Sequence, residues 1–260
     1  MEDCSGLMSF VESFEQLMRT SNTIAWTGFR LRNEGSYFGV LWYLFEPLFL
    51  FFVLLSLRPV FVKEAIPYYP VYLLTGIIIF NFFSKATHYS VSLFSRNASL
   101  LKSTNIARES LVFGGVLQFL FSHFFEFLLL LVVSLLFGIT PGWFFWYLLV
   151  LVAFVFFICG CCFILCVLGV YFNDLDNLWS VFMRLLWFLT PIFYIPPNNS
   201  IFLFFNFFNP LFYFITLFRA SILGQFLFET FFVVLFFGLF FFFVGILFFN
   251  LFKYRIVERI

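Results

Sequence analysis

Six apolar segments, separated by short polar stretches, constrain this 260-residue chain more than any other feature of its sequence. A helix needs about 20 predominantly apolar residues to cross the hydrocarbon core of a bilayer, and most of these segments reach that length. Hydrophobic residues make up 63% of the chain and charged residues 10%, a balance that is not typical of a soluble domain. We therefore expect an all-α integral membrane protein with six transmembrane helices. The expected spans are residues 38–60, 69–90, 111–137, 143–170, 178–195 and 228–251.

The composition also narrows the possible functions. A formal net charge of +1 excludes a nucleic-acid-binding role driven by bulk charge. Cys159, Cys162 and Cys166 share one helical face, where they either hold a metal or pack as small apolar residues. Because no histidine or acidic residue shares that face, packing is favoured. The 51 phenylalanines have two interpretations, an aromatic lining for a pathway or exchange among lipid-facing residues.

Lysine and arginine predict the orientation in the membrane, because cytoplasmic loops carry an excess of both. Basic residues precede the first span, separate the second from the third, and occupy the tail at 253–260 after the last. Both termini are therefore predicted to be cytoplasmic, as an even number of spans requires. The residues that define this side are Arg19, Arg30, Arg32, Arg96, Lys102, Arg108, Lys253, Arg255 and Arg259.

Three segments outside the continuous spans have patterns of their own. Residues 5–28 carry apolar side chains at helical spacing, which predicts an amphipathic helix on the cytoplasmic membrane surface. Residues 97–109 predict a short cytoplasmic helix capped by Asn97 or Ser99, either a docking element or a solvated loop. Residues 196–227 are apolar but broken into pieces of roughly 8 and 14 residues, which are too short to span. Irregular backbone at membrane depth needs protein or a water-filled cavity around it, so this segment is predicted to be re-entrant beside a translocation pathway.

Several motifs occur in an order that resembles one family of transporters. Residues 32–48, which read Arg-Asn-Glu-Gly-Ser-Tyr-Phe-Gly-Val-Leu-Trp-Tyr-Leu-Phe-Glu-Pro-Leu, resemble the start of the first span in permeases of polysaccharide-exporting ABC transporters. The insert Ser99–Ser110 is similar to their coupling helix, and residues 172–175 are similar to their Phe-Arg-Asp-Leu turn. Residues 190–194 resemble their Ser-Pro-Ile-x-Tyr motif. The resemblance covers nearly the whole chain.

Asn209-Pro210 followed by Arg219 resembles the re-entrant region of the same family. Two positions depart from the family pattern, because Asn173 replaces an arginine and Glu46 replaces a neutral residue.

The resemblance implies a non-catalytic transport subunit that itself binds no cofactor or metal. In that family two permeases form a homodimer, and a separate cytoplasmic ATP-binding subunit, which uses ATP and Mg²⁺, drives export of a lipid-linked glycan across the cytoplasmic membrane. The chain has no Gly-x-x-x-x-Gly-Lys-Ser/Thr phosphate loop, which agrees with ATP binding in a partner. The residues implied in ATPase coupling are Ser99, Leu100, Leu101, Lys102, Arg108 and Glu109. The implied pathway or gate residues are Trp42, Glu46, Arg184, Pro191, Tyr194, Asn209, Pro210 and Arg219.

Charged side chains inside apolar segments are also candidate functional residues, because lipid tolerates them poorly. Glu46 either binds a sugar hydroxyl or pairs with a neighbour near the cytoplasmic interface. His123 and Glu126, three residues apart on one helical face, form either a proton relay or a locally satisfied pair, and the second is favoured. Arg184 either attracts the diphosphate of a lipid-linked substrate or extends back to the interface. Arg219 is expected to fix the broken segment through bonds to carbonyls, with direct glycan contact as the alternative.

The sequence thus predicts the permease of an exporter for a lipid-linked polysaccharide of the O-antigen, teichoic acid or capsule type. Export of drugs or small lipids stays open. A proton-coupled secondary transporter would use Glu46, His123 and Glu126, although the chain lacks a repeated pair of broken spans in matching halves. A membrane-embedded transferase would need a catalytic cluster, and Asp174 with Asp176 is the closest approach to one.

Overall fold

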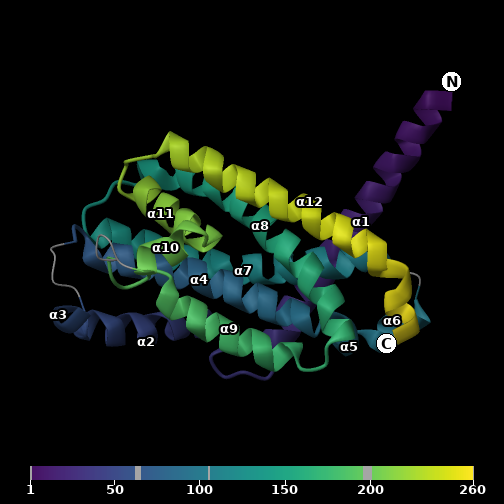
Figure 1. The fold of residues 1–260 in the computed structure, drawn as a ribbon, viewed down its shortest axis with the longest axis horizontal. Helices are drawn as coiled ribbons and strands as arrows, with labels where there is room; N and C mark the ends of the chain where they lie inside the picture. Colours follow the sequence, from purple (N-terminus) through teal and green to yellow (C-terminus); the bar gives the residue numbers. More distant parts are fainter. Residues whose placement is uncertain (1, 62–65, 105, 196–200, 260) are drawn as a thin grey trace.

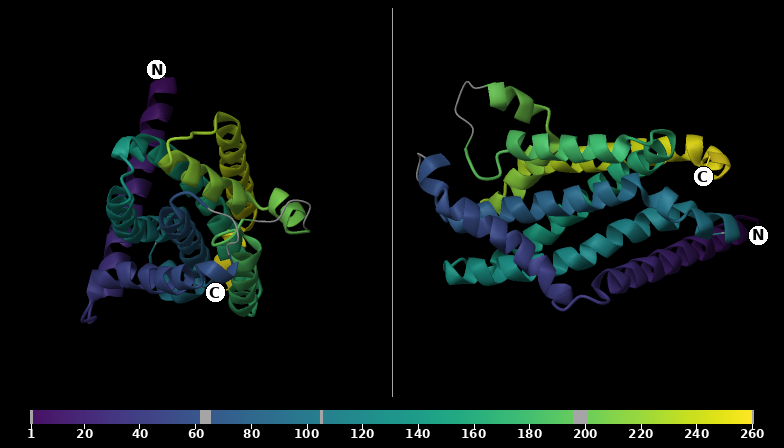
Figure 2. Two further views of the ribbon diagram at one scale, coloured as in Figure 1. Left: turned by 90° about the vertical axis from the view of Figure 1, so that its left-hand side faces the viewer. Right: turned by 90° about the horizontal axis from the view of Figure 1, so that it is seen from below.

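The computed structural model describes residues 2–61, 66–104, 106–195 and 201–259, and every regular element in these ranges is a helix. This agrees with the all-α class predicted from the apolar segments. The long helices lie side by side as a bundle, and both ends of the described chain lie at one end of it (Figures 1 and 2). They are α1 (Glu2–Asn33), α2 (Trp42–Ser56), α4 (Tyr69–Val91), α7 (Arg108–Leu136), α8 (Phe144–Tyr171), α9 (Leu175–Leu189) and α12 (Phe228–Arg259).

Five helical segments among the described residues are long and apolar enough to cross a membrane. They match the predicted first, second, third, fourth and sixth spans. Their bounds are Gly39–Ser56, Tyr69–Val91, Arg108–Leu136, Pro141–Tyr171 and Phe228–Lys253. The chain is therefore a multi-pass membrane protein.

The predicted fifth span, residues 178–195, is not among these five. It is helical only as far as Leu189, and the 15 residues of α9 rise about 22 Å, less than the roughly 30 Å of the hydrocarbon core. The helix ends because Pro191 follows Thr190, whose backbone is extended at φ −80° and ψ 131°. A residue before proline is pushed out of the helical region.

Shorter helices connect the long ones. They are η1 (Gly39–Leu41), α3 (Arg58–Phe61), α5 (Leu93–Arg96), α6 (Ala98–Ser103), η2 (Pro141–Trp143), α10 (Ile201–Phe207) and α11 (Pro210–Ile222). The predicted break within residues 196–227 is present, since α10 has 7 residues and α11 has 13. Residues 196–200 lie outside the described residues. α10 and α11 lie towards the end of the bundle away from the chain ends (Figures 1 and 2).

The amino-terminal segment is one continuous helix, longer than the predicted 5–28. The later part of α1 packs along α7 through Ser21, Ala25 and Phe29, which are spaced by four and buried. Phe14 and Met18, two members of the predicted apolar face, are exposed. The amino-terminal part of α1 extends away from the bundle (Figure 1). Its position on a membrane surface stays a prediction.

Small residues bring α8 and α12 together along their lengths. Ala153 and Gly160 on α8 face Gly238 and Gly245 on α12, so the small residues are seven apart on both helices. A Cβ atom at Gly238 would lie 2.6 Å from the carbonyl oxygen of Ala153. Helix association within a bilayer depends on such small residues, because lipid removes the hydrophobic driving force between helices.

The cysteines of α8 pack within the bundle. Cys159, Cys162 and Cys166 are buried, and the Cys162 thiol lies 3.6 Å from the carbonyl oxygen of Ala86 on α4. Within the described part of the chain, no three histidine, cysteine or acidic residues gather closely enough to hold a metal ion. The burial of the three thiol groups agrees with the packing interpretation.

Candidate functional site

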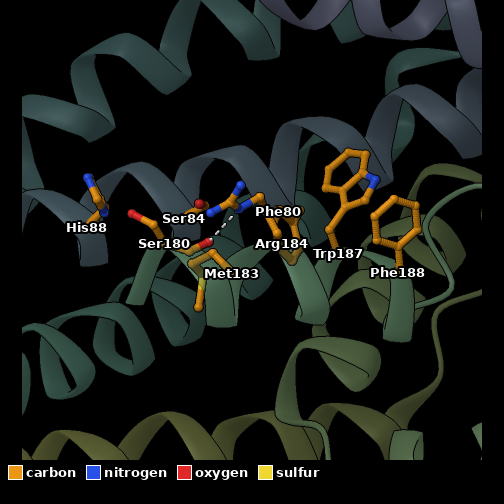
Figure 3. Close-up of a pocket in the computed structure, with 8 residues that line it drawn as sticks. All are labelled: Phe80, Ser84, His88, Ser180, Met183, Arg184, Trp187 and Phe188. Carbon is orange, nitrogen blue, oxygen red and sulfur yellow. Dashed lines mark hydrogen bonds between the residues drawn. The ribbon is translucent and has the colours of Figure 1, made fainter. Parts of the chain in front are cut away.

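A groove between α4 and α9 combines polar and aromatic side chains (Figure 3). Its cavity volume is about 380 Å³, and its lining residues are Phe80, Ser84, His88, Ser180, Met183, Arg184, Trp187 and Phe188. The polar members lie four residues apart on each helix, which places Ser84 and His88 on one face of α4 and Ser180 and Arg184 on one face of α9. Hydroxyl and charged groups beside flat rings can contact both the polar edges and the apolar faces of a sugar chain.

Arg184, one of the predicted pathway residues, lies in this groove. It is exposed, and its Nε atom donates a hydrogen bond to the carbonyl oxygen of Ser180 at 3.3 Å. Among the described residues it forms no ion pair. Nearby, Phe80 and Trp187 meet edge to face with ring centroids 4.9 Å apart. The geometry allows either an anionic ligand or extension to the interface, so both interpretations of Arg184 stay open.

Trp42 and Glu46 lie on the exposed side of α2. Together with Phe49, Leu50 and Val53 they line a shallow cavity of about 610 Å³. Pro47, in contrast, is buried against the bundle. The exposed faces of α2 and α9 are both rich in aromatic and aliphatic side chains, whereas α4 is largely buried. These two helices therefore expose apolar side chains beside the groove.

A chain of polar contacts connects α2 with the interior of the bundle. Lys85 on α4 lies 2.8 Å from the Glu46 carboxylate on α2 and 3.5 Å from the Glu126 carboxylate on α7. Glu126 is only 2% exposed, so it needs these partners. Glu46 thus pairs with a neighbour, Lys85, which was one of its two interpretations.

The chain continues from Glu126 to α8. Glu126 Oε2 lies 3.3 Å from His123 Nδ1, and His123 Nε2 lies 3.0 Å from the Tyr147 hydroxyl. An ionised carboxylate only accepts, so Nδ1 donates to Glu126, and in a neutral ring Nε2 accepts from Tyr147. His123 and Glu126 thus form a locally satisfied pair, as favoured from their spacing. Within the described residues the contacts stop at Tyr147, which is completely buried.

Lys85→Met is expected to destabilise the protein by about 2 kcal/mol, because the buried carboxyl group of Glu126 would lose its cation. This expected loss of stability is smaller than the loss from breaking a fully buried ion pair, since the Glu46 side chain is 57% exposed. The measurement is the free energy of unfolding of the purified protein. Adding Glu126→Gln should restore part of the loss, and a double variant no more stable than the single one would contradict the assignment. Arg19→Met, which removes an exposed ion pair with Glu15, is the matched control.

Four successive carbonyl groups after α9 each accept a hydrogen bond from a side chain of another helix. Arg219 donates to Pro191 O at 2.9 Å and to Ile192 O at 2.6 Å. The hydroxyls of Tyr69 and Tyr72 donate to Phe193 O and Tyr194 O at 3.1 and 3.2 Å. Non-helical backbone inside a membrane protein must find its partners within the protein. These donors explain how the chain leaves the helical path immediately after a short apolar helix.

Arg219 is the centre of this arrangement. Its Nε atom donates to Tyr72 O at 3.1 Å, and its Cζ atom lies 3.4 Å from the centroid of the Tyr72 ring. Gly76 makes the position possible, since a Cβ atom there would lie 2.6 Å from Arg219 Nη2. The carbonyl bonds expected of Arg219 are present, and they hold the end of α9 against α4. A role as a gate stays a prediction.

Asn209 connects the start of α11 to the non-helical backbone after α9. Its side chain accepts from Leu211 N at 3.1 Å as the N-cap of α11, while Pro210 occupies the first turn. Its Nδ2 donates to Thr190 Oγ1 at 2.9 Å, which joins the start of α11 to the end of α9. The Tyr194 hydroxyl donates to Phe188 O at 2.9 Å. Of the predicted gate residues, Arg219 thus contacts Pro191 directly, while Asn209 and Tyr194 bond to Thr190 and Phe188 at the end of α9.

The predicted coupling residues divide into two groups. Ser99 and Lys102 are exposed on α6, whereas Leu101 is buried and Leu100 is half-buried. The predicted cap Asn97 is the N-cap of α6, but its side chain bonds back to Leu93 O. The predicted short helix is thus the six-residue α6, shorter than the predicted 97–109, and its coupling role stays a prediction.

Arg108 and Glu109 lie beyond α6, in the first turn of α7. The guanidinium of Arg108 donates to Lys253 O at 2.7 Å, and Glu109 lies 3.2 Å from Lys253 Nζ. They join α7 to the carboxyl end of α12 within this chain. A docking role for these two side chains stays untested.

Sequence reasoning missed Lys85 and His88 on α4 and Ser180 on α9. One signal for Lys85 was present, because a lone lysine inside an apolar span is a functional candidate by itself. The side chains that contact these residues lie on other helices, so the spacing of residues along the sequence does not reveal the contacts.

Comparisons with known proteins agree with the sequence motifs. A family model described as ABC-2 type transporter matches residues 21–223. An "O-antigen export system permease protein RfbA" from Klebsiella pneumoniae is 27% identical over 236 residues, covering 88% of this chain and 90% of that protein. A protein of the same name from Myxococcus xanthus is 26% identical over 167 residues, 64% of each chain.

Proposed function

The chain belongs to the ABC-2 type transporter family, and from this premise we propose that it is the permease of an exporter that moves a lipid-linked polysaccharide out through the cytoplasmic membrane. One observation carries the choice of cargo: the match to an O-antigen export permease covers 88% of this chain and 90% of the relative. The mixed polar and aromatic lining of the α4–α9 groove supports it, because sugars offer both hydroxyl groups and apolar ring faces.

The pathway is formed between two copies of the chain. The groove is open on one side, and α2 and α9 beside it expose apolar and aromatic side chains. A second copy related by a two-fold axis would cover these faces and enclose the polar stripe of Ser84, His88, Ser180 and Arg184. The bonded region around Pro191, Tyr194 and Asn209 would close the outer end of this pathway.

The membrane topology has six crossings with both termini in the cytoplasm. α9 together with residues 190–195 forms the fifth crossing, and α10 and α11 form a re-entrant pair on the outer side. The arrangement is supported by the position of the two described chain ends at one end of the bundle (Figure 2). The basic residues near those ends favour the cytoplasmic side.

A separate ATP-binding subunit docks on α6 and drives transport. Lys102→Glu is expected to lower transport per ATP hydrolysed by about fivefold, or about 1 kcal/mol, because it reverses an exposed charge on the docking helix. Arg108 is unsuitable for this test, since it bonds Lys253 O within the chain. Arg255→Glu, an exposed charge reversal on α12, is the matched control. An unchanged ratio in the Lys102 variant would count against docking at α6.

The cargo is tested by removal and reconstitution. Cells that lack the chain should accumulate a lipid-linked glycan inside and lose it from the surface. Proteoliposomes that contain the chain and its copurified ATPase should move that glycan only with ATP. Export of a small lipid or drug with no effect on glycan would favour the alternative cargo.

A proton-coupled secondary transporter is the remaining alternative. It requires a relay through the membrane, yet the contacts of Glu46, Lys85, Glu126 and His123 stop at the buried Tyr147 within the described residues. Transport by the purified chain under a proton gradient without nucleotide would support this alternative.

A further inference from the structure

Another cavity, where α1, α4, α5 and α7 meet, is lined by several cationic side chains. Its volume is about 450 Å³, and its lining residues are Gly28, Arg32, Lys85, His88, Tyr89, Arg96, Gln118 and Phe119. No acidic residue is among its lining residues in the described part of the chain. The guanidinium and ammonium groups of arginine and lysine are side chains that bind anions.

The acidic residues near this cavity contact its lysine and its histidine but not its arginines. Glu46 and Glu126 contact Lys85, and Asp176 Oδ1 lies 3.8 Å from His88 Nε2. These carboxylates are the partners of Lys85 and His88. The two arginines form no ion pair among the described residues.

Aromatic rings hold the two arginines instead. Arg32 Cζ lies 4.9 Å from the ring centroids of both Tyr43 and Phe119, and Arg96 Cζ lies 5.8 Å from that of Tyr89. Stacking occupies the faces of a guanidinium and leaves its N–H edge for hydrogen bonds. Such an edge matches the oxygen atoms of a phosphate.

A neutral amide, that of Gln118, also lines the cavity. Gln118 is 5% exposed, and its amide forms no hydrogen bond to a described residue. Gly28 leaves room for this amide, because a Cβ atom there would lie 2.5 Å from Gln118 Oε1. A buried amide beside two unpaired arginines is typical of a polar ligand site and not of a packed core.

The cavity lies near the start of one candidate span, Gly39–Ser56, and the end of another, Tyr69–Val91. Arg32 is in the last turn of α1, and Arg96 follows the carboxyl end of the apolar helix Tyr69–Val91. Span ends are where the charged part of a lipid meets protein. We propose that this cavity binds the phosphate of an anionic lipid head group. The phosphate belongs either to a bilayer phospholipid or to a lipid-linked cargo, and the second source rests on the proposed function.

The test uses the full chain in nanodiscs of phosphatidylcholine with a trace of photoreactive phosphatidylglycerol. The wild type should be labelled on peptides that line the cavity. Arg32→Gln/Arg96→Gln should reduce labelling about tenfold, because two charge-assisted contacts are lost. Both arginines are exposed, so folding should be unchanged in size-exclusion chromatography. Arg19→Gln/Arg30→Gln, which removes two exposed cations of α1 outside the cavity, is the matched control.

Competition experiments identify which lipid supplies the phosphate, and a lysine variant tests the role of charge. Farnesyl diphosphate that competes better than added phosphatidylglycerol would assign the site to a polyprenyl-linked cargo, and the reverse order would assign it to bilayer phospholipid. Arg32→Lys/Arg96→Lys should retain at least about half of the labelling, since it keeps the charge. Equal loss in the control and cavity variants, or loss in the lysine variant, would overturn the proposal. None of these readouts requires transport, so failure here would leave the proposed function standing.

Discussion

Gly160→Leu is expected to leave little or no folded protein in the membrane. Gly160 lies where α8 and α12 touch, and even a Cβ atom there would overlap the carbonyl group of Phe241 and lie 2.6 Å from Phe242 N. These are backbone atoms of a continuous helix, so they cannot turn aside as the end of a flexible side chain can. Leucine would force the two helices apart along their close contact, which we expect to destabilise the protein by more than about 3 kcal/mol.

Helix propensity predicts the opposite sign for this variant. Leucine favours a helix over glycine by up to about 1 kcal/mol, so a loss can be attributed to the contact between helices. The measurement is the yield of monodisperse protein in detergent, followed by its thermal midpoint. Gly142→Leu is the matched control, because a Cβ atom at Gly142 would meet nothing within 4 Å. A monodisperse Gly160→Leu protein with the wild-type midpoint would contradict the close contact of α8 and α12.

Arg219→Met is expected to lower the free energy of unfolding by about 3–5 kcal/mol. The guanidinium donates to three carbonyl groups, of Tyr72, Pro191 and Ile192, and Arg219 is 7% exposed. Each carbonyl left without a donor costs about 1–3 kcal/mol. Methionine fills similar space without a donor, so the loss reports the hydrogen bonds more than the packing. The measurement is unfolding of the purified protein followed by tryptophan fluorescence.

Two further variants make the Arg219 result specific. Arg184→Met is the control, because that arginine is exposed and bonds one carbonyl, so its change should stay within about 0.5 kcal/mol. Arg219→Lys should fall between wild type and methionine, since one ammonium cannot reproduce a planar fork of donors. Equal stability of the two methionine variants would show that the backbone after α9 does not depend on Arg219.

The sequence predicted the features that depend on neighbours along the chain. The apolar segments located the five helices that are long enough to span, because lipid requires a continuous run of apolar residues. The spacing of His123 and Glu126 predicted their contact, which lies within one helix turn. The break between short helices within residues 196–227 was predicted from the short apolar pieces of that segment.

The tertiary structure decided which distant residues meet. Lys85 reaches Glu126 across 41 residues, and Arg219 reaches Tyr72 across 147, so no local period reveals either contact. Proline ends α9 locally, but the course of the chain after it was decided by tertiary structure, because α4 and α11 supply the donors for its non-helical backbone. The pattern of apolar residues in one segment predicts whether that segment can lie in lipid. The packing of one helix on another, which creates the α4–α9 groove and the cationic cavity, depends on shape and hydrogen bonding between segments that the sequence separates.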